Sequence, residues 1–216
     1  MEGSDLVCKG WPAPGLTPGL NDLIENWGNS PVPVNWEFDG DEDLTTYPGY
    51  FAVAAPATGS FAVFAPIESF LPYPRTVSNP YPLIFKSQVR LVSTIGGTNL
   101  SMFILDFATD AIFSGDYLEM ICSYQVGEAN YQIECNGGPL TFQVFDTGIP
   151  VTNDVTFEVV VTISDNTIQI FINGVLKLYS FLFNFPQVGY LALTPQRHGA
   201  SDQGVFGRTE IYTQAP

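Results

Sequence analysis

The densest group of side chains that could do chemistry is the acidic run at residues 39–43, which reads Asp-Gly-Asp-Glu-Asp. Carboxylates at alternate positions can supply the oxygen ligands that Ca²⁺ prefers. A calcium loop of this kind also needs a glycine at its sixth position and a later glutamate, but Leu44 takes the sixth position and no glutamate completes the set. The pattern therefore favours a solvated acidic turn, with calcium binding by Asp39, Asp41 and Asp43 as the alternative.

Thiols are the second group of interest. Cys122 and Cys135 flank a turn expected at residues 127–130, and a symmetric hairpin would place them directly opposite one another. Both fall on the apolar face of their strands. They could form a cross-strand disulfide, but the chain start shows no secretory signal, which favours two reduced core thiols. With Cys8 the chain has three cysteines and a single histidine, which do not suggest a zinc site with its four ligands.

That histidine, His198, lies in a stretch expected to be a loop, and no serine or cysteine motif accompanies it. It is therefore interpreted as an ordinary polar loop residue rather than a catalytic base. The sequence contains no Gly-x-Ser-x-Gly elbow, phosphate-binding loop or dinucleotide fingerprint. It predicts a protein that is not an enzyme and that has no catalytic, cofactor-binding or metal-binding residue.

Charge narrows the classes of partner. The chain carries 22 acidic and 7 basic residues, and its net charge of -15 argues against nucleic-acid binding. No apolar run is long enough to span a bilayer, and without a signal a virion or cytoplasmic location is expected. Charged residues make up 13% of the chain, about half the usual share of roughly 25%. Such sparse charge is typical of surfaces that contact partners, although a large apolar core would give the same composition.

The elements that must position these residues are short strands. In residues 155–164 apolar side chains at odd positions alternate with mostly polar ones, including Thr162, which are expected to face solvent. Asn173-Gly174 supplies the positive φ angles of a tight two-residue hairpin. About ten such strands at close spacing, with no long helix, predict an all-β, antiparallel sandwich or barrel.

The first part of the chain differs in character. Residues 1–46 are rich in proline and aromatic residues and predict an extended N-terminal arm, since proline interrupts regular ladders. Within the arm, one short helix is possible at residues 20–27, with Trp27 on its apolar face. Residues 47–216 are assigned to the sandwich. We expect the arm's aromatic residues to pack along the body or on a neighbouring subunit.

Residues 157–175 and 189–193 resemble the late hairpin and the following strand of the concanavalin A-like, laminin G-like jelly rolls. In that superfamily an apolar strand ends in an Asn-Gly turn, and a Gly-aromatic-apolar strand follows. The resemblance covers roughly residues 85–213 and implies a two-sheet jelly-roll sandwich. Such domains bind glycans, bind proteins, hydrolyse polysaccharides or build larger assemblies.

Hydrolysis is the least favoured of these activities. The laminarinase-like hydrolases of this fold carry Glu-x-Asp-x-x-Glu on one strand, which places paired carboxylates on the concave face. The nearest string begins at Glu37 and continues through Asp39 to Glu42, but it includes the expected turn at Gly40. It also lies outside the matched region.

Two functions remain. The first is a non-enzymatic structural or interaction protein, a jelly-roll subunit of a larger assembly such as a virion decoration, cement or tail component. Its partners would be other protein subunits, in a homo- or hetero-oligomer. The second is a carbohydrate-binding, lectin-like domain in which tyrosines such as Tyr47 and Tyr50 stack on sugars. Sparse charge and the aromatic arm favour the first.

Overall fold

The computed structural model describes residues 23–27, 42–53, 63–66, 83–92, 99–108, 117–137, 140–152, 154–164, 167–181, 190–198 and 202–213. Within these ranges every regular element is a β-strand, and no helix could cross a membrane. The strands are β1 (Leu23–Glu25), β2 (Glu42–Asp43), β3 (Ala52–Val53), β4 (Val63–Pro66), β5 (Leu83–Val92), β6 (Leu100–Ala108), β7 (Tyr117–Tyr124), β8 (Asn130–Gly137), β9 (Leu140–Pro150), β10 (Asp154–Ser164), β11 (Thr167–Ile172), β12 (Val175–Phe181), β13 (Tyr190–Pro195), β14 (Arg197–His198) and β15 (Asp202–Thr213).

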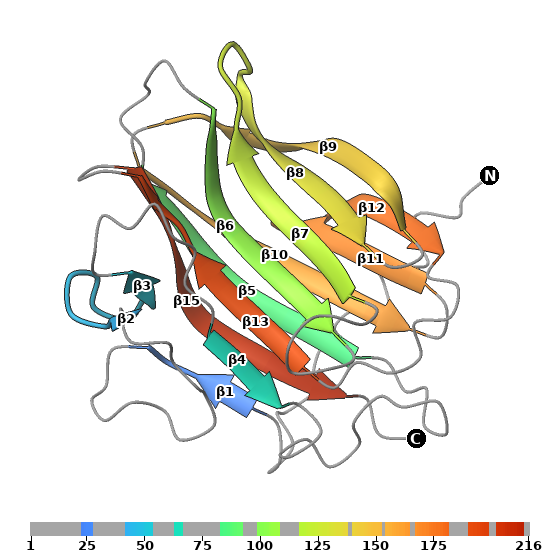
Figure 1. Cartoon of the computed structure of the whole chain (residues 1–216), viewed down its shortest axis with the longest axis horizontal. Helices are drawn as coiled ribbons and strands as arrows, with labels where there is room; N and C mark the ends of the chain where they lie inside the picture. Colours follow the sequence, from blue (N-terminus) through green and yellow to red (C-terminus); the bar gives the residue numbers. More distant parts are fainter. Residues whose placement is uncertain are drawn as a thin grey trace.

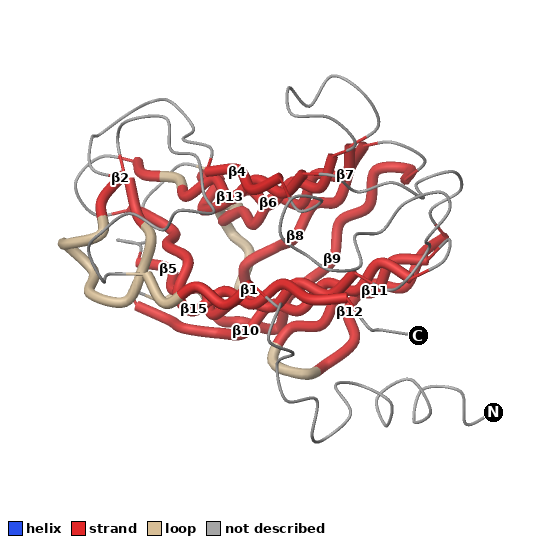
Figure 2. Tube along the Cα trace, turned by 90° about the horizontal axis from the view of Figure 1, so that it is seen from below, coloured by secondary structure: helices blue, strands red, loops and turns tan. Residues whose placement is uncertain are grey.

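The strands build two antiparallel sheets that pack face to face (Figures 1 and 2). Sheet A has the order β1-β15-β5-β10-β11-β12, with β14 attached to β15. Sheet B has the order β4-β13-β6-β7-β8-β9, and β2 pairs with β3 beside them. The chain passes repeatedly from one sheet to the other, since β5 and β10 lie in sheet A and β6 to β9 in sheet B. The prediction of an all-β, two-sheet antiparallel sandwich is confirmed.

Aromatic pairs join the two sheets through the core. Phe85 of sheet A meets Phe107 of sheet B edge to face, with ring centroids 6.0 Å apart. Phe206 of sheet A meets Phe103 of sheet B at 5.2 Å, also edge to face. All four side chains are buried. This geometry is favoured because the positive ring edge meets the negative ring face.

The alternation predicted for β10 holds on its inner face but only partly on its outer face. Thr156 is exposed as expected, whereas Thr162 is 6% exposed, so the prediction that it faces solvent is wrong. Its neighbours on the same outer face are buried too: Ile84 lies opposite Thr162, and Phe171 lies opposite the buried Val160. A strand pattern shows which face is apolar, but it cannot show that the other face is covered as well.

The hairpin predicted at Asn173-Gly174 is confirmed. Asn173 has φ 48° and Gly174 has φ 76°, and the turn joins Ile172 to Val175. Both central residues of this two-residue turn have positive φ, which asparagine and glycine tolerate best.

The short helix considered at residues 20–27 is wrong for the part that the structure describes. Leu23–Glu25 is strand β1, which pairs antiparallel with β15 and places Leu23 opposite Ile211. A helix of eight residues is marginal in water, whereas pairing with β15 satisfies the backbone groups of both segments. Residues 20–22 and 28–41 lie outside the described residues, so the division of the chain at residue 46 stays a prediction.

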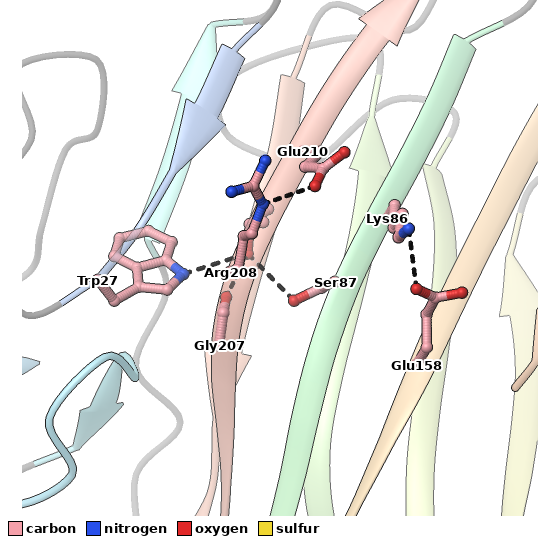
Figure 3. Close-up of polar contacts among 8 residues, drawn as sticks. Trp27, Lys86, Ser87, Glu158, Gly207, Arg208 and Glu210 are labelled. Atoms are coloured by element: carbon pink, nitrogen blue, oxygen red, sulfur yellow. Dashed lines mark hydrogen bonds and ion pairs between the residues drawn. The ribbon is translucent and has the colours of Figure 1, made fainter. Parts of the chain in front are cut away.

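Trp27 shows where this part of the arm packs. Its side chain is 2% exposed, and its ring is tilted against Phe51 with centroids 5.2 Å apart. Its Nε1 donates a hydrogen bond to Thr209 Oγ1 at 3.1 Å, and Ser87 Oγ lies 3.1 Å from the same oxygen (Figure 3). Trp27 therefore packs on the sandwich of its own chain, while Trp11 and Trp36 lie outside the described residues.

Candidate functional site

Of the acidic run, the structure describes Glu42 and Asp43, which form β2, whereas Asp39 and Asp41 lie outside the described residues. Asp43 Oδ1 accepts hydrogen bonds from the backbone nitrogens of Thr45 and Thr46, each at 2.9 Å. Burial raises the pKa of Asp43, but hydrogen bonds from Thr46 and Thr45 outweigh burial and lower this pKa to about 2. The carboxylate thus stabilises its own turn. No group of three metal-ligating side chains gathers among the residues that the structure describes.

The two thiols lie on neighbouring strands, but not opposite one another. Cys135 faces Met120 and Cys122 faces Ile133, so the predicted register is wrong by two residues. The turn comes one residue earlier than expected: Gly127 has φ 94°, and the Glu128 backbone nitrogen donates to the Gln125 carbonyl at 3.1 Å. A shift of the turn by one residue moves every pair by two and keeps each side chain on its face.

Both cysteines are free and buried, as predicted. Burial raises the pKa of Cys135 to about 12 and raises that of Cys122 as well. Both are therefore protonated core residues near neutral pH.

His198 lies in β14 rather than in a loop. Its Nε2 is 2.6 Å from the carbonyl oxygen of Ser101, so the imidazole links sheet A to the start of β6 in sheet B. This contact gives His198 a structural role between the two sheets.

Tyr47 and Tyr50 do not form a free stacking surface. Their rings lie 5.2 Å and 6.0 Å from the guanidinium of Arg90, which projects from the outer face of sheet A. Arg90 also binds both carboxylate oxygens of Asp154, at 2.8 Å and 2.7 Å, and Gln203 Nε2 donates to the Tyr47 hydroxyl. These tyrosines hold the segment before β3 on sheet A.

A polar group that the sequence analysis did not single out lies on the outer face of sheet B. The inner residues of β6, β7 and β8 belong to the core, so the residues between them point outward. The register places Asp106 opposite Glu119 and Glu119 opposite Asn136. One pair further along, Ile121 lies opposite Glu134. We call Asp106, Glu119, Ser123, Gln125, Glu134 and Asn136 the polar face.

Hydrogen bonds hold the two glutamates in place. Asn136 Nδ2 donates to Glu119 Oε1 at 3.3 Å. Ser123 Oγ and Gln125 Nε2 both donate to Glu134 Oε1, at 3.0 Å and 3.1 Å. In each glutamate, Oε1 is the oxygen that accepts these hydrogen bonds, and Oε2 accepts none of them. Both carboxylates therefore have fixed positions and retain acceptor capacity.

The carboxyl group of Asp106 differs from these two. Burial, with a further contribution from the negative charge of Glu119, raises the pKa of Asp106 to about 7. Burial also raises the pKa of Glu119; the Asn136 hydrogen bond lowers it and the charge of Glu134 raises it. Near neutral pH Asp106 is therefore divided between a neutral acid that can donate a hydrogen bond and an anion that can only accept.

Asp106→Asn is expected to stabilise the protein at pH 8 by about 1–2 kcal/mol, after allowance for solvent at this half-buried group. The folded-state pKa lies above the ordinary value of 3.8. The wild type therefore loses stability as the pH rises from about 4 to about 7, whereas the neutral amide does not. Urea denaturation at several pH values checks this.

Asp146→Asn is the control for this prediction, because the side chain of Asn130 lowers the pKa of this exposed carboxyl group. Its replacement should bring no gain at pH 8. Parallel pH profiles for wild type and Asp106→Asn would contradict the charge argument.

Exposed apolar side chains border the polar face on β9. Val144 lies opposite Glu134 and is 47% exposed, and Phe142 is 59% exposed. The outer face of sheet B thus combines oriented carboxylates and amides with apolar surface.

The sequence matches no protein-family model and no curated protein. Solved structures match the fold. The VIP36 exoplasmic/lumenal domain in its Ca²⁺/Man-bound form has a TM-score of 0.64 at 13% identity, over 91% of this chain and 91% of that one. The Emp47p carbohydrate recognition domain gives 0.58 at 13% identity, over 90% and 96%. Bacillus licheniformis beta-glucanase gives 0.57 at 11% identity, over 90% and 99%.

These likenesses show that the chain has a concanavalin A-like jelly-roll fold, as the sequence resemblance implied. The same fold serves proteins whose names indicate sugar recognition and one whose name indicates an enzyme. Function must therefore be argued from the polar face rather than from the fold.

Proposed function

We propose that the protein is a non-catalytic carbohydrate-binding domain whose binding site is the polar face of sheet B. The observation that carries this proposal is the row of carboxylates and amides across β6, β7 and β8, held by their own hydrogen bonds. Sugar hydroxyls both donate and accept hydrogen bonds, so fixed carboxylates and amides can select their orientation. Val144 and Phe142, beside this row, can cover the apolar C–H surface of a sugar ring.

The comparisons support this class of ligand. VIP36 was solved in a Ca²⁺/Man-bound form, and the Emp47p domain is a carbohydrate recognition domain. A role in a virion, which sparse charge favoured at the level of sequence, gains no support from the comparisons. Glycan binding therefore takes first place.

Cleavage of a glycan is the second candidate, and one observation favours it. Asp106, whose pKa is raised to about 7, lies directly opposite Glu119. A protonated carboxyl group beside an ionised one is the combination that glycosidases use as acid and base. We place binding first because the raised pKa of Asp106 follows from burial beside Glu119 and needs no catalytic role.

A glycan array followed by titration calorimetry tests the binding proposal. Wild type should bind at least one oligosaccharide, and Glu119→Gln and Glu134→Gln should each weaken this binding at least about tenfold. Glu158→Gln is the matched control, because Glu158 pairs with Lys86 on the outer face of sheet A. It should leave affinity unchanged.

Two outcomes would count against the proposal: no glycan bound by a folded protein, or equal weakening by Glu158→Gln. A reducing-end assay on any bound oligosaccharide separates binding from cleavage. New reducing ends that disappear in Asp106→Asn would favour the second candidate.

A further inference from the structure

The exposed apolar side chains of the described residues are concentrated at one edge of the sandwich. The large exposed ones are Val126, Phe142, Val144, Val175 and Tyr179. All but Val126 lie on β9 or β12, the last strands of sheets B and A. The two strands lie side by side, since Gln143 Nε2 donates to Ser180 Oγ at 3.4 Å (Figures 1 and 2).

We call β9 and β12 together the double edge. Its net charge is zero, unlike that of the chain as a whole. The single charged residue of β9 is Asp146 and that of β12 is Lys177, so their charges cancel, while the chain carries -15. Monomeric proteins usually protect a long edge strand with lysine, proline, inward-pointing charges or β-bulges. In β9 a proline occurs only at its last position, Pro150, and the register against β8 is irregular on both sides of residues 143–146. Residues 143–146 are therefore the regular part of this edge.

We propose that β9 and β12 form a homodimer interface, in which β9 pairs antiparallel with β9 of a second copy across a two-fold axis. An edge strand presents unpaired backbone donors and acceptors, and these are complementary to the same strand running in the opposite direction. A register centred on Gln143 places Phe142 opposite the partner's Val144 on the outer face. An apolar cross-strand pair of this kind stabilises antiparallel pairing.

Charge selects a second copy as the occupant. Two chains of charge -15 repel one another over most of their surface, so a neutral, apolar edge is where they can approach. The size of the edge is that of a weak dimer. A strand of 11 residues is about 37 Å long, and two sheets about 10 Å apart give a contact of roughly 400 Å² per copy. The total of about 800 Å² lies below the usual range of specific interfaces and is typical of weak, concentration-dependent association.

This surface differs from the one that the sequence indicated, where the aromatic residues of the N-terminal arm were expected to pack along the body or on a neighbouring subunit. Of that arm, Trp27 is buried within its own chain, against Phe51. Phe142 and Val144 also border the proposed glycan site, but the interface uses the edge of β9 that pairs with no other described strand. Dimerisation is measured without any glycan, so the two proposals can fail independently.

Sedimentation velocity over the micromolar range tests the dimer with the full chain. Wild type should be dimeric, and its affinity should increase from about 0.15 M to about 0.5 M salt, because salt screens the repulsion between two acidic copies. Val144→Lys should weaken dimerisation at least about tenfold by placing a charge at the shared edge.

Val126→Lys is the matched control. It adds the same charge at a side chain of similar exposure, 53% against 47%, but in the β7–β8 turn. It should dimerise like wild type, and circular dichroism should show that both variants fold. A wild type that stays monomeric throughout, or a Val126→Lys variant weakened as much as Val144→Lys, would overturn the proposal.

Discussion

Trp27→Ala is expected to lower the free energy of unfolding by about 3–5 kcal/mol, the range for removing a large aromatic side chain from a core. The indole is 2% exposed and packs against Phe51, which is itself fully buried. Alanine would leave a cavity between β1 and the sandwich. It would also remove the donor to Thr209 Oγ1, an oxygen that donates in turn to the Gly207 carbonyl at 2.9 Å.

Urea denaturation measures this loss, and Trp27→Phe separates its two parts. Phenylalanine keeps most of the apolar volume but has no N–H group, so it should cost only about 1–2 kcal/mol. If Trp27→Ala unfolds at the same urea concentration as wild type, the segment around β1 contributes nothing to the stability of the sandwich. Residues 1–46 would then behave as the detachable arm that the sequence suggested.

The strands that sequence patterns predict well are long and have one apolar face. β10 shows a period of two along its inner face, and Asn173-Gly174 fixes the register of the following hairpin. β1 could not be found in this way because a strand of three residues is too short to show a period. The prediction that Thr162 faces solvent failed for another reason. Tertiary packing decides what covers the outer face of a sheet, and the sequence of a single strand does not show it.

The polar face could be predicted from the sequence only in part. Asp106 interrupts an apolar alternation, and Glu119 and Glu134 alternate with core residues, so each could be placed on the outer side of its own strand. That β6, β7 and β8 are neighbours is also expected of consecutive hairpins. The register between these strands could not be predicted, because the pairing expected for Cys122 and Cys135 is wrong by two residues. The acidic run at residues 39–43 is the more conspicuous signal in the sequence, because its carboxylates are adjacent, whereas those of the polar face are dispersed over three strands.

Gly204→Ala is expected to cost at least about 3 kcal/mol, because its Cβ would collide with backbone rather than with a movable side chain. A Cβ built at Gly204 lies 2.2 Å from the Met102 carbonyl oxygen and 2.8 Å from its carbon. Gly204 lies in β15 of sheet A and Met102 in β6 of sheet B, so this is a point where the two sheets approach closely. The approach is fixed on both sides, since the Gly204 nitrogen donates to the Gln196 carbonyl at 3.0 Å and the Gln196 nitrogen donates to the Met102 carbonyl at 3.1 Å.

Gly127→Ala is the comparison that isolates this collision. Gly127 has a positive φ of 94° but nothing within 4 Å of its Cβ position, so alanine there meets backbone strain without a clash and should cost about 1–2 kcal/mol. Gly204 presents the opposite case, since its φ is not in the left-handed region and the cost comes from the clash alone. In thermal or urea denaturation, Gly204→Ala should therefore be clearly less stable than Gly127→Ala. The reverse order would mean that β15 and β6 can separate at little cost, and that the sandwich is not closed at this point.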